Sequence, residues 1–173
     1  MTTERTRWAP LEEKDFPDML EMAAEPDTFK YLRFLQVMTD EEYRQFLYAK
    51  LEQIRNQTGY HWAVHLKTNG AFIGAVNLNP IKGTSRMQIG CQLKRACWNQ
   101  GFASELTRRV LDFATDEIRL TEVYGVFEKD NFISRRLLEK LGFAWVETKK
   151  EAMDIEVEVH KYLSSLKYPP PNA

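Results

Sequence analysis

Apolar residues recur at the three-to-four spacing of an amphipathic helix in four parts of the chain. The pattern predicts helices over residues 10–25, 40–57, 102–118 and 131–143. Asp40 and Asn131 are suited to capping two of them, because their side-chain oxygens accept hydrogen bonds from first-turn amides. Thr58-Gly59 and Gly142 mark the ends of the same two helices, where glycine readily adopts the left-handed conformation.

Alternation of apolar and polar positions predicts strands in much of the rest of the chain. These stretches are residues 60–66, 71–78, 87–93, 121–127 and 154–163. The first two flank Asn69-Gly70, a pair that favours a type I′ hairpin turn, whose twist matches that of paired strands. Helices interleaved with a hairpin-rich sheet predict a mixed α/β domain.

The bulk composition is ordinary for a globular protein: 173 residues, 43% of them hydrophobic and 28% charged. We predict one domain over residues 1–167 and a flexible proline-rich tail over 168–173. The net charge of −1 gives no reason to expect a nucleic acid or a membrane as partner. Two cysteines are too few for a disulfide framework, and the start of the chain has no apolar leader. These features together predict a cytoplasmic protein.

The stretch "WNQGFASE", from Trp98 to Glu105, lies where a predicted strand leads into a predicted helix. The first turn of a helix leaves backbone N–H groups without internal partners, and these attract an anion such as a phosphate. Gly101 lets the backbone approach a ligand closely because it has no Cβ, and Ala103 is also small. A plain tight turn is the alternative interpretation of a single glycine here.

Two longer segments carry a family resemblance. "IGCQLKRACWNQGFASELTRRVLDFA" followed by "NFISRRLLEKLGF" resembles the GNAT superfamily of acetyltransferases, and most closely its RimJ/RimL-like branch. The superfamily motif Gln/Arg-x-x-Gly-x-Gly/Ala corresponds to residues 98–103, with Trp98 in place of Gln or Arg. The pattern Asn-x-x-Ser followed by Leu-Glu-Lys-Leu-Gly-Phe matches residues 131–143 throughout. The resemblance covers most of residues 7–163, including a first strand and helix at "WAPLEEKDFPDML".

The resemblance implies one mixed, mostly antiparallel seven-stranded sheet flanked by about four helices. Its central parallel strands would splay apart to hold acetyl-CoA. Pantetheine would pair with the backbone near Cys91, Leu93 and Lys94. The pyrophosphate would lie on the loop at Trp98, Asn99, Gln100, Gly101, Phe102, Ala103 and Ser104, which is the anion site predicted above. Lys94, Arg95 and Arg135 would add positive charge for the phosphates, unless they are plain surface residues.

The resemblance also suggests an acid for the departing thiolate of CoA. The tyrosine that many relatives use is replaced by Leu138, and Ser134 matches the serine proposed in the RimL-like branch. Asn131 would orient the pantetheine or hold the loop. The alternatives are that Ser134 bonds only its own helix backbone and that Asn131 is only a helix cap.

The base that must deprotonate the acceptor amine is left open. Many relatives carry a glutamate where this chain has Gln88. The candidates are water, Glu151, Asp154, Glu156, Glu158 and His160, although an alternating strand of this kind is often a solvated face. His61 and His65 share one strand face, and without cysteine or aspartate nearby they do not indicate a metal site.

The function predicted from these residues is acetyl transfer from acetyl-CoA to a primary amine by direct attack. The acceptor classes left open are a protein or peptide N-terminus, a polyamine or another small amine. The acidic run from Glu147 to Glu158 would attract a cationic amine if it lines the acceptor cleft. Apolar residues at 29, 31, 32, 34 and 35 would line that cleft, a subunit contact or the core. A non-catalytic acetyl-CoA-binding module is the alternative function, and the chain is expected to be a monomer or a homodimer.

Overall fold

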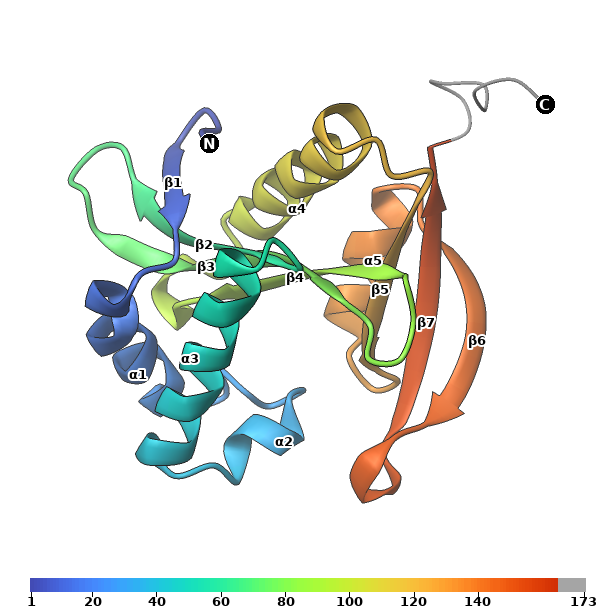
Figure 1. Cartoon of the computed structure of the whole chain (residues 1–173), viewed down its shortest axis with the longest axis horizontal. Coiled ribbons are helices and arrows are strands. Elements are labelled where there is room, and N and C mark those ends of the chain that lie inside the picture. Colours follow the sequence, from blue (N-terminus) through green and yellow to red (C-terminus); the bar gives the residue numbers. More distant parts are fainter. Residues whose placement is uncertain (165–173) are drawn as a thin grey trace.

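A computed structural model describes residues 1–164 as one seven-stranded sheet with helices on both faces (Figure 1). The strands are β1 (Thr6–Pro10), β2 (Tyr60–Leu66), β3 (Phe72–Pro80), β4 (Met87–Leu93), β5 (Glu122–Glu128), β6 (Ala144–Lys150) and β7 (Glu156–Leu163). Their order in the sheet is β1-β2-β3-β4-β5-β7-β6. Among the described strands, β4 and β5 form the one parallel pair. The predicted mixed, mostly antiparallel sheet is therefore confirmed.

The helices divide between the two faces of the sheet. They are α1 (Phe16–Ala24), α2 (Arg33–Gln36), α3 (Asp40–Arg55), α4 (Phe102–Asp112) and α5 (Phe132–Lys140). The apolar stripes of α1 and α3 bury Phe16 and Leu47 against Ala63 of β2 on one face. On the other face, α4 buries Leu106 and α5 buries Leu138 in a second core that extends from β1 to β5. The five α-helices agree with the predicted number of about four.

The sheet opens between β4 and β5. Within the described residues, Gln88 and Tyr124 are the one bridged pair between these two strands, whereas every other neighbouring pair is bridged along most of its length. The carboxyl ends of both strands therefore lie apart, and the predicted splay is confirmed. In open α/β sheets a ligand binds at such a point, beyond the carboxyl ends of parallel strands.

Several local predictions need correction. The cap of α3 is Thr39 rather than Asp40: its hydroxyl accepts from the Glu42 amide, and the Glu42 carboxylate accepts from Thr39 in return. The β2–β3 turn is not type I′, because Gly70 has a positive φ of 74° but Asn69 does not. Instead Asn69 Oδ1 accepts from the amide of Ala71 at 3.0 Å, which closes a longer loop.

Strand β6 and helix α2 were not predicted from the sequence. Residues 144–150 lack clean alternation, because a bulge between Trp145 and Glu147 shifts the register against β7 and six of the seven side chains are exposed. Helix α2 has four residues, too few to establish a period. The predicted tail at 168–173 lies outside the described residues.

Candidate functional site

The turn before α4 is built to leave backbone amides open. Its N-cap is Gly101 in the left-handed conformation (φ 80°), preceded by Asn99 with φ 58°. A glycine cap has no side chain to occupy the first-turn amides, and α4 has no side-chain cap. A Cβ added at Gly101 would meet one atom within 4 Å, on the Arg5 guanidinium. This geometry is compatible with the anion site expected at residues 99–104, which stays a prediction.

Trp98 and Gln100 hold this turn against the end of β4. The Trp98 indole Nε1 donates to the Leu93 carbonyl at 2.8 Å, and Gln100 Nε2 donates to the Ala96 carbonyl at 2.6 Å. The departure from the family pattern at Trp98 therefore has a structural reason, because the indole N–H fixes the loop to the strand. The cofactor contact predicted for Trp98 stays a prediction.

The backbone of β4 presents part of its edge to the splay. Lys94 N–H donates to the Ile73 carbonyl at 2.9 Å, so its amide faces β3 and not the splay. Backbone groups alternate in direction along a strand, so Leu93 and Cys91 direct theirs toward β5. The Leu93 carbonyl is occupied by Trp98, which leaves the Leu93 amide and both groups of Cys91 for a pantetheine chain. Of the three predicted backbone partners, Cys91 and Leu93 suit the role and Lys94 does not.

The Cys91 side chain is not a nucleophile in this environment. Burial raises the pKa of its thiol to about 12, and the nearby Thr107 hydroxyl offsets this only in part. A thiol with such a pKa stays protonated at neutral pH. Cys91 therefore contributes its backbone and its packing to the site.

Each cation predicted to meet the phosphates has a carboxylate partner. Lys94 Nζ lies 3.1 Å from Glu21, and Arg95 donates its amide to Glu25 at 2.7 Å while its guanidinium lies 3.4 Å from Asp27. These carboxylates belong to α1 and to the turn that follows it. Arg135 is engaged most fully, because Nε and Nη2 both donate to the Glu158 carboxylate. Its predicted phosphate contact would have to come from Nη1, which makes no hydrogen bond within residues 1–164.

The start of α5 lies at the same end of the splay as the start of α4. The Asn131 amide donates to the Glu128 carbonyl at the end of β5, and Asn131 Oδ1 accepts from the Ser134 amide at 3.0 Å. Asn131 is therefore the predicted helix cap. The Ser134 hydroxyl is half-buried and makes no hydrogen bond within residues 1–164, so it is not occupied by the backbone of its own helix.

The acidic run predicted near the acceptor is divided and largely paired. Glu151 lies beside Lys149, Asp154 beside Lys150 and Glu156 beside Lys129, each at 2.8–2.9 Å. Glu158 and His160 are buried rather than solvated, and they lie on the face that α5 covers. Burial alone would raise the pKa of Glu158, but hydrogen bonds from His160 and Arg135 outweigh it and hold that pKa below its usual range.

His61 and His65 do not form a metal site. No group of three metal-ligating side chains occurs in the described part of the chain. His61 is buried with its Nε2 2.7 Å from Gln53 Oε1, and His65 stacks edge-on against Phe72. Burial, helped by the charge of Lys50, lowers the pKa of His61 to about 3.

This histidine predicts a pH-dependent stability. The unfolded chain takes up a proton at His61 below its ordinary pKa of about 6.5, whereas the folded chain does so only near pH 3. We therefore expect His61 not to lower the free energy of unfolding above pH 6.5. Below pH 6.5, the free energy of unfolding should fall by up to about 1.4 kcal/mol per pH unit. Urea unfolding at several pH values between 7 and 4 measures this slope. His61→Gln should flatten it and His65→Gln should not; equal slopes in all three proteins would show that another group is responsible.

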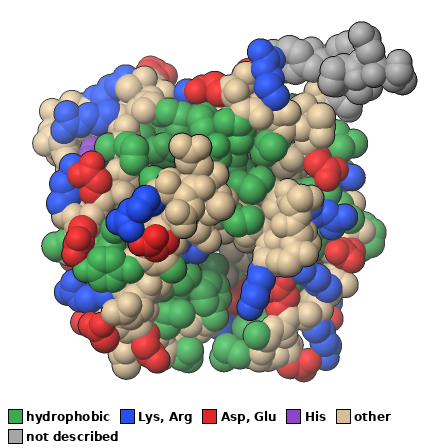
Figure 2. Space-filling view, viewed as in Figure 1, with side chains coloured by type: hydrophobic (Ala, Val, Ile, Leu, Met, Phe, Trp, Pro, Cys, Tyr) green, Lys and Arg blue, Asp and Glu red, His purple; other side chains and the backbone are tan. Residues whose placement is uncertain are grey.

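The face of the sheet that carries α1–α3 is hollowed near its middle, between α2–α3 and β7 (Figure 2). A cavity of about 200 Å³ there is lined by Arg33, Glu128, Lys129, Asp130, Asp154, Ile155 and Glu156. Glu128 is the buried member: its Oε1 accepts from the Arg33 amide, and Arg33 Nε lies 2.9 Å from Oε2 without an aligned hydrogen bond. The sequence interpretation missed Glu128, although its position at the end of a parallel strand is the signal that would have identified it.

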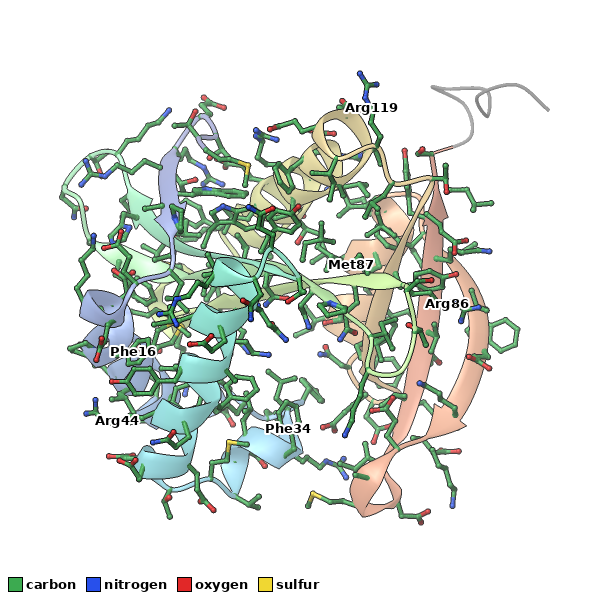
Figure 3. All side chains as sticks on the ribbon, in the orientation of Figure 1. Phe16, Phe34, Arg44, Arg86, Met87 and Arg119 are labelled. Carbon is green, nitrogen blue, oxygen red and sulfur yellow. The ribbon has the colours of Figure 1, made fainter. Side chains whose placement is uncertain are left out.

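The apolar residues between α1 and α3 have mixed roles. Phe29 and Leu35 are core residues, and Phe34 is exposed and packs on Phe46 at 6.2 Å between ring centroids. Figure 3 labels Phe34 on α2 and Arg86, the residue before β4. Arg86 places its guanidinium 5.0 Å from the centre of the Tyr124 ring, at the closed end of the splay.

Comparison with known proteins shows the family to which the chain belongs. The profile of the GNAT acetyltransferase domain matches residues 5–144. The uncharacterised protein YkkB of Bacillus subtilis is 30% identical over 99 residues, which are 54% of this chain and 58% of YkkB. The chain thus spans little more than half of that relative. The chain belongs to the GNAT acetyltransferase domain family, and the family predicted from the sequence is confirmed.

Solved structures share the fold at low sequence identity. RimL, a ribosomal L7/L12 alpha-N-protein acetyltransferase in complex with coenzyme A, superposes with a TM-score of 0.80 at 14% identity, covering 94% of this chain and 96% of RimL. Spermidine N-acetyltransferase from Vibrio cholerae, in complex with CoA and spermine, gives 0.77 at 19% identity, covering 93% and 96%. At these identities the likeness is one of fold, and the RimJ/RimL-like branch stays a prediction. No helix in residues 1–164 is long and apolar enough to cross a membrane.

Proposed function

We propose that this protein is an acetyl-CoA-dependent N-acetyltransferase that transfers the acetyl group to a primary amine by direct attack in a ternary complex. The observation that carries the proposal is the pairing of two features at one end of the β4–β5 splay. An uncapped helix start at Gly101 offers amides to an anion, and the β4 edge at Cys91 and Leu93 offers amides to an extended chain. A phosphate joined to an extended amide chain is what CoA presents.

In this proposal, acetyl-CoA supplies the acetyl group and a thiol leaving group when bound. The turn at residues 99–104 holds the pyrophosphate, and the free backbone groups of Cys91 and Leu93 orient the pantetheine arm. An N–H of this strand is also suited to stabilise charge that develops on a carbonyl oxygen. Holding both substrates in the splay contributes to rate through proximity.

We assign the role of acid to Ser134. Its hydroxyl has no partner among the described residues, and it lies in the first turn of α5 at the open end of the splay. It would donate its proton to the departing thiolate and regain one from water, which takes up the proton of the amine. Asn131 acts as a positioning residue, because its side chain fixes the Ser134 amide.

The proton of the amine passes to water in this proposal. The predicted carboxylate bases are paired with lysines or, for Glu158, with Arg135 and His160. Gln88, which cannot take a proton, lies at the closed end of the splay. Water molecules could carry the amine proton toward the cavity at Glu128 while all of these ion pairs stay intact.

The acceptor would approach through that cavity. Its lining has four carboxylates, from Glu128, Asp130, Asp154 and Glu156, against the two cations Arg33 and Lys129. The excess of negative charge favours a cationic amine, such as a polyamine or the N-terminus of a peptide or protein.

The two free cysteines support a reducing, cytoplasmic setting. A monomer or a homodimer is compatible with the proposal.

The test is release of free CoA thiol from acetyl-CoA across a panel of primary amines. The panel holds peptides with different N-terminal residues, polyamines, amino sugars and free amino acids. We expect release that depends on one acceptor class. If a folded protein binds acetyl-CoA but no amine on the panel, nor a candidate ribosomal protein, stimulates release, the non-catalytic binding module replaces this proposal.

A further inference from the structure

Arg5, which lies just before β1, reaches the loop at the start of α4 almost a hundred residues away. Its Nε donates to Glu105 at 2.7 Å, and its Nη1 donates to the Gln100 carbonyl at 2.9 Å. Its guanidinium lies 3.8 Å from the centre of the Phe102 ring. The Arg5 amide also donates to Glu105 at 3.2 Å. One side chain thus joins three residues of the proposed phosphate loop and its helix.

The third guanidinium nitrogen of Arg5, Nη2, is available as a hydrogen-bond donor. Nη2 makes no hydrogen bond within residues 1–164, and it lies 3.6 Å from where a Cβ of Gly101 would be. Apart from Gly101, its own helix backbone and its two chain neighbours, no other described atom lies within 4 Å of that point. The free N–H donors of Arg5 therefore flank the same space as the uncapped amides of α4.

The other cations proposed for the phosphates are held by partners outside this loop. Lys94 and Arg95 are drawn toward carboxylates that follow or belong to α1, and both Arg135 donors that face Glu158 are used. Arg5 is also paired, with Glu105, but that contact uses the Nε side of its fork. A planar guanidinium can bind a carboxylate on one side while it presents donors on the other.

We propose that Arg5 is a cofactor-binding residue that donates from Nη2 to the pyrophosphate of CoA and, through Gln100 and Phe102, holds the loop in its binding shape. This inference rests on the proposed use of acetyl-CoA. The ligand chemistry it requires is a phosphate ester or anhydride attached to the pantetheine arm.

A purely structural role for Arg5 makes a different prediction. If the Arg5–Glu105 pair only stabilises the fold, its loss would affect the binding of every part of the cofactor equally and would lower the melting temperature. If only its positive charge matters, lysine would replace it. Lysine has no fork, so it cannot reach Glu105, the Gln100 carbonyl and the space over Gly101 together.

The experiment measures binding of CoA by calorimetry and of pantetheine, which lacks the pyrophosphate and the nucleotide, by NMR titration. The proteins are wild type, Arg5→Lys, Arg5→Ala and the control Arg7→Ala, a neighbouring exposed arginine on β1. We expect both Arg5 variants to bind CoA about tenfold more weakly or worse, the loss of about one charge-assisted contact. Pantetheine binding and the melting temperature should change little, and Arg7→Ala should match wild type.

Three results would overturn the inference: unchanged CoA affinity in Arg5→Ala, full affinity in Arg5→Lys, or parallel losses for CoA and pantetheine. Binding without turnover in wild type would refute the proposed transferase activity and leave the role of Arg5 standing. Absence of CoA binding in wild type would refute both.

Discussion

Ser134→Ala is expected to lower kcat for acetyl transfer by about a hundredfold or more, the usual contribution of a positioned general acid. The dissociation constant for acetyl-CoA should stay near that of wild type. The reason lies in the geometry of α5: the capping oxygen Asn131 Oδ1 accepts a hydrogen bond from the Ser134 backbone amide and not from the Ser134 hydroxyl, so alanine keeps the helix start intact. The effect should fall on the chemical step alone, which single-turnover kinetics with saturating acetyl-CoA would measure.

Two comparisons make this result specific to proton donation. Ser134→Thr keeps a hydroxyl and should recover part of the rate, whereas Ser85→Ala, in the exposed turn between β3 and β4, should leave the rate unchanged. A thiol of lower pKa is a better leaving group and depends less on an acid. With an acetyl donor that carries such a thiol, the difference in kcat between wild type and Ser134→Ala should therefore be smaller. A gap of the same size with both donors would mean that Ser134 contributes by contact and not as an acid.

The sequence predicted those features of the candidate site that depend on the local backbone. A glycine at a strand-to-helix corner has few uses, and Gly101 takes the left-handed conformation that leaves α4 uncapped. Asn131, as cap of α5, was equally predictable, because a side-chain oxygen just before an apolar period is a local signal. The splay itself was implied by the family resemblance, and no pattern of apolar residues could have located it.

What the sequence could not supply was the pairing of distant side chains. Arg5 and Glu105 meet only because β1 and α4 lie on neighbouring parts of the fold, and neither residue has a local signature. The strand that carries Glu156 and Glu158 shows the same difficulty. Alternation correctly placed both residues on one face, but it did not reveal that α5 covers Glu158 and leaves Glu156 near the edge.

This difference between two glutamates on one strand carries the largest stability prediction. Glu158 accepts from Arg135 Nε at 2.9 Å and lies 3.1 Å from His160 Nε2, in a buried network under α5. Glu158→Ala would leave the guanidinium of Arg135 and the buried imidazole of His160 without their common partner. Breaking a buried pair in this way costs about 3 kcal/mol, and the partial exposure of Arg135 argues for the lower part of the usual range.

Glu156→Ala is the matched control, because Glu156 is two residues away on β7 and pairs with Lys129 at 2.9 Å near the surface. Its loss should cost less than about 1 kcal/mol. Urea unfolding at pH 7 measures both, and the double variant Glu158→Ala with Arg135→Ala should lose less than the sum of the two single variants. Equal effects of the two glutamate variants would mean that the buried network adds nothing to the fold.

The pH dependence provides an independent measure of the same network. Because the fold holds the pKa of Glu158 below its ordinary value, the stabilisation from its carboxylate is present above that ordinary value and is lost as the pH falls below it. Glu158→Gln keeps the shape but removes this titration, so the difference in unfolding free energy between wild type and Glu158→Gln should shrink steadily toward acid pH. His61 destabilises both proteins alike over this range, so it cancels in that difference and leaves the contribution of Glu158 alone.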